Sequence, residues 1–499
     1  MGGTICRRDR QPGQIGRGLL PLPWFLMKNL MDAAAEAEDI LGHPPTIQEM
    51  FVILDKKNLT KILRDPYTIA GLMSTLLRED IVYVDSIAYR WTVRKQEGYF
   101  SYSELFTKYY GGAEMHGTMP DGRIVARKAR TVNYTQLVNI LKSKDQAVFV
   151  ENAWIWDGTF HFLDQTEVIG NGGHCNHIMF SSFPRSGNSF LRRLVEQLTG
   201  ISTGSTLPLI TGTFLQTMGM KGEGCIDDSI WITKSHHPLL YFKAQAFNAN
   251  KSFMVVRNPL DVFPSYAALM NTMSHGNKPD YDIPVEYPEW WAWWVHTVAK
   301  QMKDFFRIIR RDYFETKRCP LYIVRYEDLC LQKKETLMGL MQFILAEKDL
   351  KGSNAERRID QVVGMGLKAS ISYNLKATTG QLNIHERAYT PELRQFVQNE
   401  LAEMIYYFGY ANVGTQNPTG FFEYEKHAPE NLTIYNKFKI DSQQALDEIC
   451  SESYRPTHIE TLTGECFDVL SAEMMTNVQN PALTHARKIL DAAAAAKQK

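Results

Sequence analysis

Three short segments of the chain combine positively charged side chains with hydroxyl, imidazole or glycine residues, the groups that bind phosphate-like anions and move protons. They are FPRSGNSFL at 183–191, TKSHHP at 233–238 and VRNPLDVFPS at 256–265. Each follows a short apolar run, so each is predicted to leave the end of a β-strand. The sequence therefore predicts three junctions at which an anion is bound or a proton is transferred.

The first segment has the composition of an anion cradle. Gly187 lets the backbone turn sharply and expose N–H groups at the start of the next helix, beside the Arg185 guanidinium. Ser186 and Ser189 add hydroxyl donors. The pattern is not a Walker A loop, because the lysine followed by a metal-binding hydroxyl is missing. The alternative is an ordinary strand-to-helix turn in which Asn188 or Ser189 caps the helix.

The second and third segments add a base and two further cations. Lys234 and His236 are two residues apart at a predicted strand end, so their side chains point to the same side. There a lysine can compensate charge on a leaving oxygen and a histidine can accept a proton. The alternative for this segment is a polar loop before a helix. Arg257 and Ser265, eight residues apart on neighbouring elements, suit a phosphomonoester.

Short apolar runs alternate with helical patterns from about His177 onward. The expected strands cover 178–183, 230–233, 253–256 and 321–324, and helices are expected from Asn188, after Pro238, after Pro259 and from Glu327. This alternation predicts an α/β fold with a central parallel sheet flanked by helices. Binding sites in such sheets lie at the carboxyl ends of the strands, which is where the three segments fall.

The rest of the chain is expected to form extensions around this domain. Residues 1–45 are a basic tail that leads into a short helix at 32–41. Residues 46–175 are expected to be a mainly helical extension with some strands, at 81–84, 147–150 and 159–163. The α/β domain is expected at 176–412 and a C-terminal extension at 413–499.

Composition narrows the class of protein. The 499 residues carry 55 Lys plus Arg and 55 Asp plus Glu, so the formal charge of zero gives no general attraction to nucleic acid or an anionic bilayer. The seven cysteines are scattered without any CxxC, which favours a reducing compartment over a disulfide framework. The sequence contains no apolar run of about 18 residues, so we expect no transmembrane helix. We expect a cytoplasmic protein, with a mitochondrial one as the alternative because the first 30 residues are basic.

The three segments together resemble the sulfotransferases that use 3′-phosphoadenosine 5′-phosphosulfate (PAPS). FPRSGNSFL resembles the family's 5′-phosphosulfate loop in its arginine version, KSHHP the segment with the catalytic lysine and histidine, and VRNPLDVFPS the 3′-phosphate element. RYEDL at 325–329 resembles a recurring strand-to-helix segment, in which we interpret Glu327 and Asp328 as helix-start acids. The order and spacing fit over residues 176–410, which includes a segment similar to the family's last helix at 390–410.

The resemblance implies PAPS as co-substrate, no metal, and a small-molecule, glycan or peptide acceptor that offers a hydroxyl or an amine. It implies that Lys234 binds the oxygen bridging phosphate and sulfate, and that His236 takes the proton of the acceptor. The residues that it assigns to the phosphosulfate are Arg185, Ser186, Gly187, Asn188 and Ser189, and those that it assigns to the 3′-phosphate are Arg257 and Ser265.

Two departures from the family pattern stand beside these matches. Phe190 occupies a position where the family often has tryptophan, and an Arg-Lys-Gly loop is missing, so that only Lys376 and Gly380 are rough candidates for its role. The tryptophans of the segment PEWWAWW at 288–294 are expected to be core and acceptor-wall residues.

Other classes of protein remain as alternatives. The long extensions are compatible with protein partners and with a catalytically idle sulfotransferase fold that serves as a structural subunit. Against an idle site, the charged residues of all three segments are present. A nucleotide kinase is disfavoured by the missing Walker lysine.

Overall fold

A computed structural model describes the part of the chain that contains the three junctions. The described residues are 33, 35–43, 49, 52–53, 81–85, 90–95, 98–101, 114–118, 124–128, 132–145, 148–150, 153–156, 159–162, 166–167, 177–200, 203–206, 226, 230–240, 246–272, 279, 281–364, 386–410, 437–455, 459–460, 465–468 and 481–497. Every residue assigned to catalysis or to PAPS by the sequence lies within them, whereas Lys376 and Gly380 lie outside.

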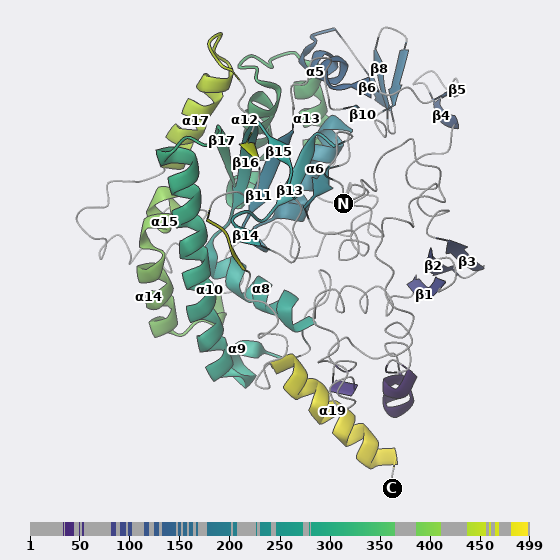
Figure 1. Cartoon of the computed structure of the whole chain (residues 1–499), viewed down its shortest axis with the longest axis vertical. Helices are drawn as coiled ribbons and strands as arrows, with labels where there is room; N and C mark the ends of the chain where they lie inside the picture. Colours follow the sequence, from purple (N-terminus) through teal and green to yellow (C-terminus); the bar gives the residue numbers. More distant parts are fainter. Residues whose placement is uncertain are drawn as a thin grey trace.

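A five-stranded parallel sheet lies at the centre of the domain (Figure 1). Its strands, in spatial order, are β12 (Gly204–Ser205), β13 (Ile232–Ser235), β11 (Ile178–Ser182), β16 (Lys251–Val256) and β17 (Leu321–Arg325). The predicted α/β fold with a central parallel sheet is therefore confirmed. The second strand begins two residues later than expected, and Lys234 consequently lies within the strand rather than after it.

Both faces of the sheet are buried, which explains the nearly continuous apolar runs of its strands. Met254 and Val256 pack in one core while Phe253 and Val255 pack in the other, as the alternation of side chains along a strand requires. The helices that contribute to the first core are α8 (Pro259–Thr272), α10 (Pro288–Ile309), α14 (Pro391–Glu400) and α15 (Ala402–Tyr407). Those that contribute to the second are α5 (Tyr134–Lys142), α6 (Asn188–Thr199), α11 (Tyr326–Leu331), α12 (Lys333–Leu345), α13 (Asn354–Gly364) and α17 (Lys437–Ile449).

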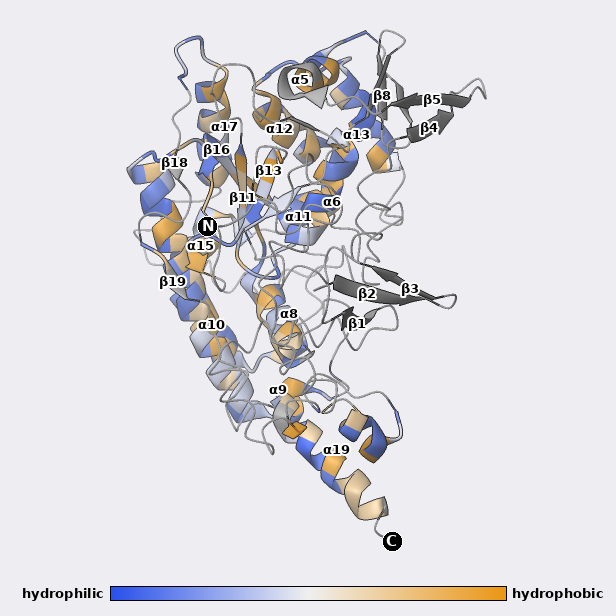
Figure 2. Ribbon diagram, turned by 45° about the vertical axis from the view of Figure 1, so that its right-hand side comes forward, coloured by the Kyte–Doolittle hydropathy of each residue, from blue (hydrophilic) through white to orange (hydrophobic). Residues whose placement is uncertain are grey.

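The long helix α10 is anchored by its tryptophans. The indole of Trp294 donates to the carbonyl oxygen of Phe263 at 3.1 Å, and that of Trp291 to Ala388 at 2.5 Å. Trp290 stacks on Trp294 and is also buried. Figure 2 shows hydrophobic and hydrophilic residues side by side along this helix, as expected for an element with one buried stripe. The expected core role of these tryptophans is thus what the packing shows, although Trp293 is partly exposed.

Three short helical segments complete the domain around α10. They are α9 (Ile283–Glu286), the π-helical turn η2 (Arg310–Glu315) and the 3₁₀ turn η3 (Glu386–Ala388). Among the described helices, none combines the length and apolar character needed to cross a bilayer.

The described part of the N-terminal extension contains short strands and one helix that docks on the domain. Among the described residues of 81–167 strand exceeds helix, whereas the helices expected before this stretch lie largely outside the described residues, so the expectation of a mainly helical extension over 46–175 stays a prediction. Asn354 holds α5 through bonds to Ile140 and Ser143. The strands are β1 (Ile81–Asp85), β2 (Arg90–Lys95), β3 (Gly98–Ser101), β4 (Glu114–Thr118), β5 (Ile124–Lys128), β6 (Val132–Asn133), β7 (Val148–Val150), β8 (Ala153–Trp156), β9 (Thr159–Phe162) and β10 (Thr166–Glu167).

The C-terminal part of the chain packs on the edge of the sheet. Strand β17 is the outermost strand, so its outward N–H groups need partners from another element. The hydroxyl of Ser442 in α17 accepts the backbone N–H of Ile323 at 3.0 Å, and Asp441 accepts the Tyr407 hydroxyl. The last helix, α19 (Pro481–Lys497), begins where the N–H of Ala482 donates to the Asn271 side chain.

Two further strand pairs join the C-terminal segment to the connection between β13 and β16. Strand β14 (Leu239–Leu240) pairs with β19 (Phe467–Asp468), and β15 (Asn248–Ala249) pairs with β18 (Ile459–Glu460). The prediction of a helix directly after Pro238 is therefore wrong for residues 239–240, because these residues form a strand that pairs with β19.

His237 lies at the start of this connection and is fully buried. Its Nε2 faces the guanidinium of Arg318 at 3.3 Å, and its Nδ1 lies 3.7 Å from the sulfur of Cys466. An arginine can only donate, so Nε2 accepts and Nδ1 carries the proton of the neutral ring. Burial, together with the positive charge of Arg318, lowers the pKa of His237 to about 3.

This pKa predicts a specific loss of stability in acid. Between about pH 6.5 and pH 3 the unfolded chain binds a proton at His237 that the folded chain does not. The free energy of unfolding should therefore fall as the pH is lowered through this range, with a slope of up to about 1.4 kcal/mol per pH unit from this residue. His237→Gln should flatten that slope in urea titrations at a series of pH values. An equal slope in wild type and His237→Gln would show that His237 is not held neutral.

Candidate functional site

The three predicted junctions meet at the carboxyl edge of the sheet. Ser182 at the end of β11 lies opposite Val255 of β16, and Ser181 lies opposite Ser235 of β13. The residues that follow these strands therefore converge above the same edge, as expected for a site in a parallel α/β sheet.

The loop between β11 and α6 contains two residues with a left-handed backbone conformation. Arg185 and Gly187 adopt φ angles of 67° and 101°, in the left-handed region. A β-carbon on Gly187 would lie 2.5 Å from Cδ2 of Tyr326, so only glycine fits there. Gly187 is also the N-cap of α6, which leaves the helix start without a side-chain cap. The ordinary capped turn, with Asn188 or Ser189 as the cap, is thus not what forms.

The side chains of this loop are held by one neighbouring junction and by the strand that precedes the loop. Arg185 donates through Nε to the hydroxyl of Ser265 in α8 at 3.0 Å, although the two residues are 80 positions apart. Asn188 donates from its amide to the hydroxyl of Ser182 at 2.9 Å. Ser186 is buried in the loop and Ser189 is partly exposed on the first turn of α6. The two predicted phosphate elements are therefore in direct contact through Arg185.

The ring of His236 is fixed by the backbone at the end of β11. Its Nδ1 lies 2.7 Å from the carbonyl oxygen of Ser182. A carbonyl oxygen can only accept, so Nδ1 carries a proton and the lone pair of the neutral ring is on Nε2. Lys234, two residues earlier, is 5% exposed. His236 and His237 have different partners: the first ring contacts the Ser182 carbonyl, and the second contacts Arg318 and Cys466.

Arg257 follows β16 and lies over an aromatic ring. Its guanidinium lies 4.5 Å from the centroid of Tyr326, and Nη2 lies 3.6 Å from a carboxylate oxygen of Asp261. Its Nε is buried and has no hydrogen-bond partner among the described residues. A buried donor without a partner is costly, so this atom is a candidate for a ligand or water contact.

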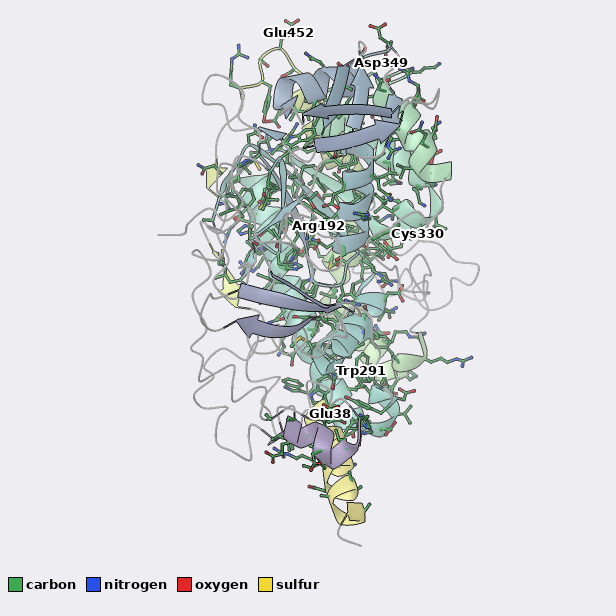
Figure 3. The ribbon with its side chains drawn as sticks, turned by 90° about the vertical axis from the view of Figure 1, so that its right-hand side faces the viewer. Glu38, Arg192, Trp291, Cys330, Asp349 and Glu452 are labelled. Carbon is green, nitrogen blue, oxygen red and sulfur yellow. The ribbon has the colours of Figure 1, made fainter. Side chains whose placement is uncertain are left out.

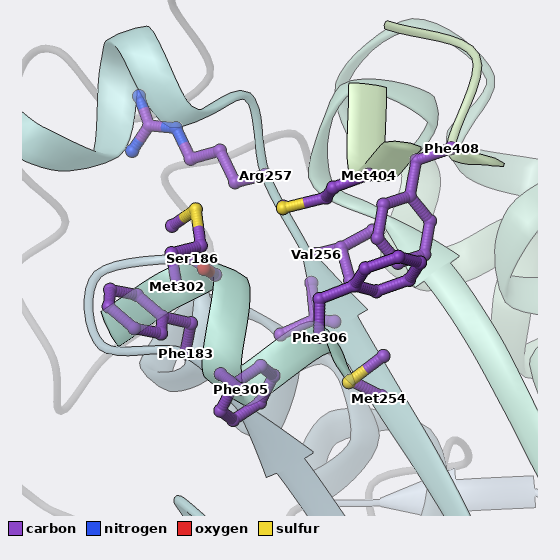
Figure 4. A pocket seen from close by; sticks show the side chains of 11 residues that line it. Phe183, Ser186, Met254, Val256, Arg257, Met302, Phe305, Phe306, Met404 and Phe408 are labelled. Atoms are coloured by element: carbon purple, nitrogen blue, oxygen red, sulfur yellow. The ribbon is translucent and has the colours of Figure 1, made fainter. Parts of the chain in front are cut away.

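A small apolar pocket lies beside Arg257 (Figure 4). Its cavity volume of about 10 Å³ is enough for no more than one water molecule. Figure 4 shows the guanidinium of Arg257 pointing away from the apolar side chains. This pocket is therefore part of the packing beneath the arginine rather than a space for a substrate. The lining residues are Phe183, Ser186, Met254, Val255, Val256, Arg257, Met302, Phe305, Phe306, Met404 and Phe408.

Several residues that hold the predicted site residues or their strands in place were not predicted from the sequence. The buried Arg192, labelled in Figure 3, donates to the hydroxyl and the carbonyl of Thr203 just before β12. Strand β12 pairs with β13 at Lys234, so Arg192 holds the neighbour of the lysine strand. Glu327 was expected only to start a helix and Tyr326 was given no role, yet both contact the predicted phosphate elements. No pattern in the sequence distinguishes such residues from ordinary helix residues.

Within the described residues no group of three or more His, Cys, Asp or Glu side chains is arranged to hold a metal ion. The cationic and hydroxyl side chains of the three predicted segments lie at or after the ends of three neighbouring strands. Their arrangement suits an anion with more than one phosphate-like group.

Comparison with known proteins identifies the domain that carries this site. The family model of the sulfotransferase domain matches residues 176–365. A WSCD family member of Aedes aegypti is 27% identical over 199 residues, covering 37% of this chain and 55% of that protein. A WSCD family member of Drosophila melanogaster is 25% identical over 166 residues, covering 33% of this chain and 49% of that protein. The chain thus spans about half the length of the curated relatives that it matches.

Among solved structures, a mouse sulfotransferase, SULT7A1, complexed with PAP is similar at a TM-score of 0.32 and 15% identity. That similarity covers 50% of this chain and 89% of the mouse chain. The match of the family model, over the residues that form the parallel sheet and its three junctions, identifies residues 176–365 as a sulfotransferase domain.

Proposed function

We propose that the protein transfers a sulfuryl group from PAPS to a hydroxyl or amine acceptor by in-line displacement. The observation that carries the proposal is the hydrogen bond from Arg185 to Ser265, which places the predicted phosphosulfate loop against the predicted 3′-phosphate helix. A nucleotide with phosphate groups at both its 3′ and 5′ positions would be bound by such a pair of elements.

The residues present fit this donor. The start of α6 has no side-chain cap, and Arg185 and Arg257 add two cations, the second with a buried Nε that lacks a partner among the described residues. When bound, PAPS would supply the sulfuryl group and a phosphate leaving group. Arg257 and Ser265 would hold the 3′-phosphate, and the loop from Arg185 to Ser189 would hold the phosphosulfate.

His236 and Lys234 have complementary roles in the proposed reaction. The lone pair on Nε2 of His236 takes the proton of the acceptor, while the bond from Nδ1 to Ser182 keeps the ring in that tautomer. The acceptor oxygen then forms a bond to sulfur as the bond from sulfur to the bridging oxygen breaks. Lys234 compensates the negative charge that develops on the bridging oxygen, which lowers the barrier.

The first test concerns Arg257 and the 3′-phosphate. Arg257→Ala should weaken the binding of 3′-phosphoadenosine 5′-phosphate by about ten- to a hundredfold, the usual effect of losing a charge-assisted hydrogen bond. Adenosine 5′-phosphate, which lacks the 3′-phosphate, should bind the variant nearly as well as wild type. Titration calorimetry measures both. The control is Arg310→Ala, because Arg310 pairs with Glu315 and Glu403. Equal losses for the two nucleotides would contradict the assignment of Arg257.

The second test concerns His236. His236→Ala should lower turnover by roughly 10²–10⁴, the contribution of a positioned base, and leave nucleotide affinity nearly unchanged. The exposed His296 provides the control, since His296→Ala should keep both quantities. Full turnover in His236→Ala would rule out the proposed proton transfer.

The third test separates the lysine from the histidine. Lys234→Met keeps the buried volume but removes the charge, so it should lose turnover because the leaving oxygen is no longer compensated. A donor with a more acidic leaving group should partly restore the activity of Lys234→Met and not that of His236→Ala. The same degree of rescue in both variants would contradict the division of roles.

A further inference from the structure

The segment RYEDL at 325–329 joins two parts of the domain. Arg325 forms a two-bonded pair with Asp328 and donates to the carbonyl oxygens of Phe408 and Gly409. These contacts fix the end of the last helix of the domain. They leave the two residues between them, Tyr326 and Glu327, without a role in that junction.

Tyr326 lies between the two phosphate elements of the site. One side of its ring contacts Gly187, where a β-carbon would clash with it, and the guanidinium of Arg257 stacks on the ring at 4.5 Å. Phe190 of α6 packs edge-on against the same ring. The ring therefore sets the distance between the loop and the arginine.

Glu327 fixes the turn that carries Arg257. Its side chain is 2% exposed, and Oε1 accepts the backbone N–H of Asn258 at 2.9 Å. Asn258 in turn accepts the N–H of Leu260 with its side-chain oxygen, which starts helix α8. The carboxyl group thus orders the turn between the arginine and the helix that bears Ser265.

The second carboxyl oxygen of Glu327, Oε2, lies in a different environment from Oε1. Glu327 Oε2, Arg257 Nε and the Tyr410 hydroxyl are all buried without a hydrogen-bond partner among the described residues. Burial raises the pKa of Glu327 to about 7, against the lowering effects of the Asn258 N–H and the charge of Arg257. The carboxyl group is therefore close to the midpoint of its titration in neutral solution.

From this geometry, and resting on the function proposed above, we propose that Glu327 is a positioning residue for Arg257 that takes up a proton on Oε2 when a 3′-phosphate binds. The phosphate would neutralise Arg257, which is the charge that favours the ionised form of Glu327. The Glu327 carboxylate, which the charge of Arg257 then no longer stabilises, takes a proton from solvent on Oε2. Nucleotide affinity should consequently decrease as the pH rises through about 7, because binding is coupled to proton uptake and the concentration of protons falls.

Several other charged and titratable groups act on Glu327 or lie in the same cluster. Asp261 of α8 opposes ionisation of Glu327. Tyr410 after α15, Cys330 of α11 and Arg325 at the end of β17 are electrostatically coupled to it. Asp328 belongs to the same cluster through Arg325 and Tyr410. Among the carboxylates, Asp328 offers a matched control, because it lies in the same helical turn but is paired with Arg325 rather than with the phosphate turn.

The test is the number of protons taken up when 3′-phosphoadenosine 5′-phosphate binds. It is obtained by calorimetry at about pH 8 in buffers with different ionisation enthalpies, since the nucleotide's own phosphates are fully ionised there. Wild type should take up a fraction of a proton, and Glu327→Gln should take up none. The ratio of wild-type to Glu327→Gln dissociation constants should rise by up to about tenfold between pH 6 and pH 8.5, the change expected for a one-unit rise in pKa on binding.

Asp328→Asn should keep the proton uptake of wild type. A purely structural role for Glu327 would instead weaken binding equally at every pH and leave proton uptake unchanged, which would overturn the inference. If Glu327→Gln does not fold, wild type alone decides the question. Its proton uptake should be larger with 3′-phosphoadenosine 5′-phosphate than with adenosine 5′-phosphate, and equal uptake would overturn the inference. Absence of any nucleotide binding by wild type would be a different result, because it would overturn the proposed function itself.

Discussion

The contact between Gly187 and the ring of Tyr326 is the constraint on which the arrangement of the site depends. It leaves no room for a β-carbon, so the loop after β11 can approach β17 across the intervening strand β16. The same ring supports the guanidinium of Arg257. The loop after β11 and the turn after β16 are thereby held against the same side chain. Without this close approach, the Arg185 and Arg257 segments would not share a common support for the proposed nucleotide.

Support for the site also comes from distant parts of the chain. The Arg192 and Thr203 bonds hold β12 beside the lysine strand, and the buried His237 ring is enclosed by Arg318 and Cys466. Cys466 is 229 positions from His237, in the region expected to be an extension. The C-terminal segment thus contacts the residue next to the proposed base. The proposed base is thus fixed by the Ser182 carbonyl, and the packing around His237 supports the adjacent backbone.

The sequence predicted the parts of this account that depend on local pattern. The parallel sheet followed from short apolar runs that alternate with helical patterns. The resemblance to sulfotransferases pointed to the domain that the family model matches at 176–365.

Contacts between distant residues were not predictable in this way. Nothing in the local sequence at Arg185 indicates Ser265 as its partner, and Glu327 looks like any acid in the first turn of a helix. Its significance comes from burial and from the N–H of Asn258, 69 positions away. The extended conformation of residues 239–240, where a helix was expected to begin, likewise depends on pairing with β19, which lies far along the chain. Tertiary pairing overrides local preference at such places.

The central claim is that this edge of the sheet transfers a sulfuryl group and does not merely hold a nucleotide. The most direct measurement is the transfer of radiolabelled sulfate from PAPS to a panel of phenols, sterols, glycans and peptides, by wild type and by a double variant with Lys234→Met and His236→Ala. Label should appear on at least one class of acceptor with wild type, and none above background should appear with the double variant. Tight nucleotide binding without transfer to any acceptor, or equal transfer by the double variant, would contradict the central claim.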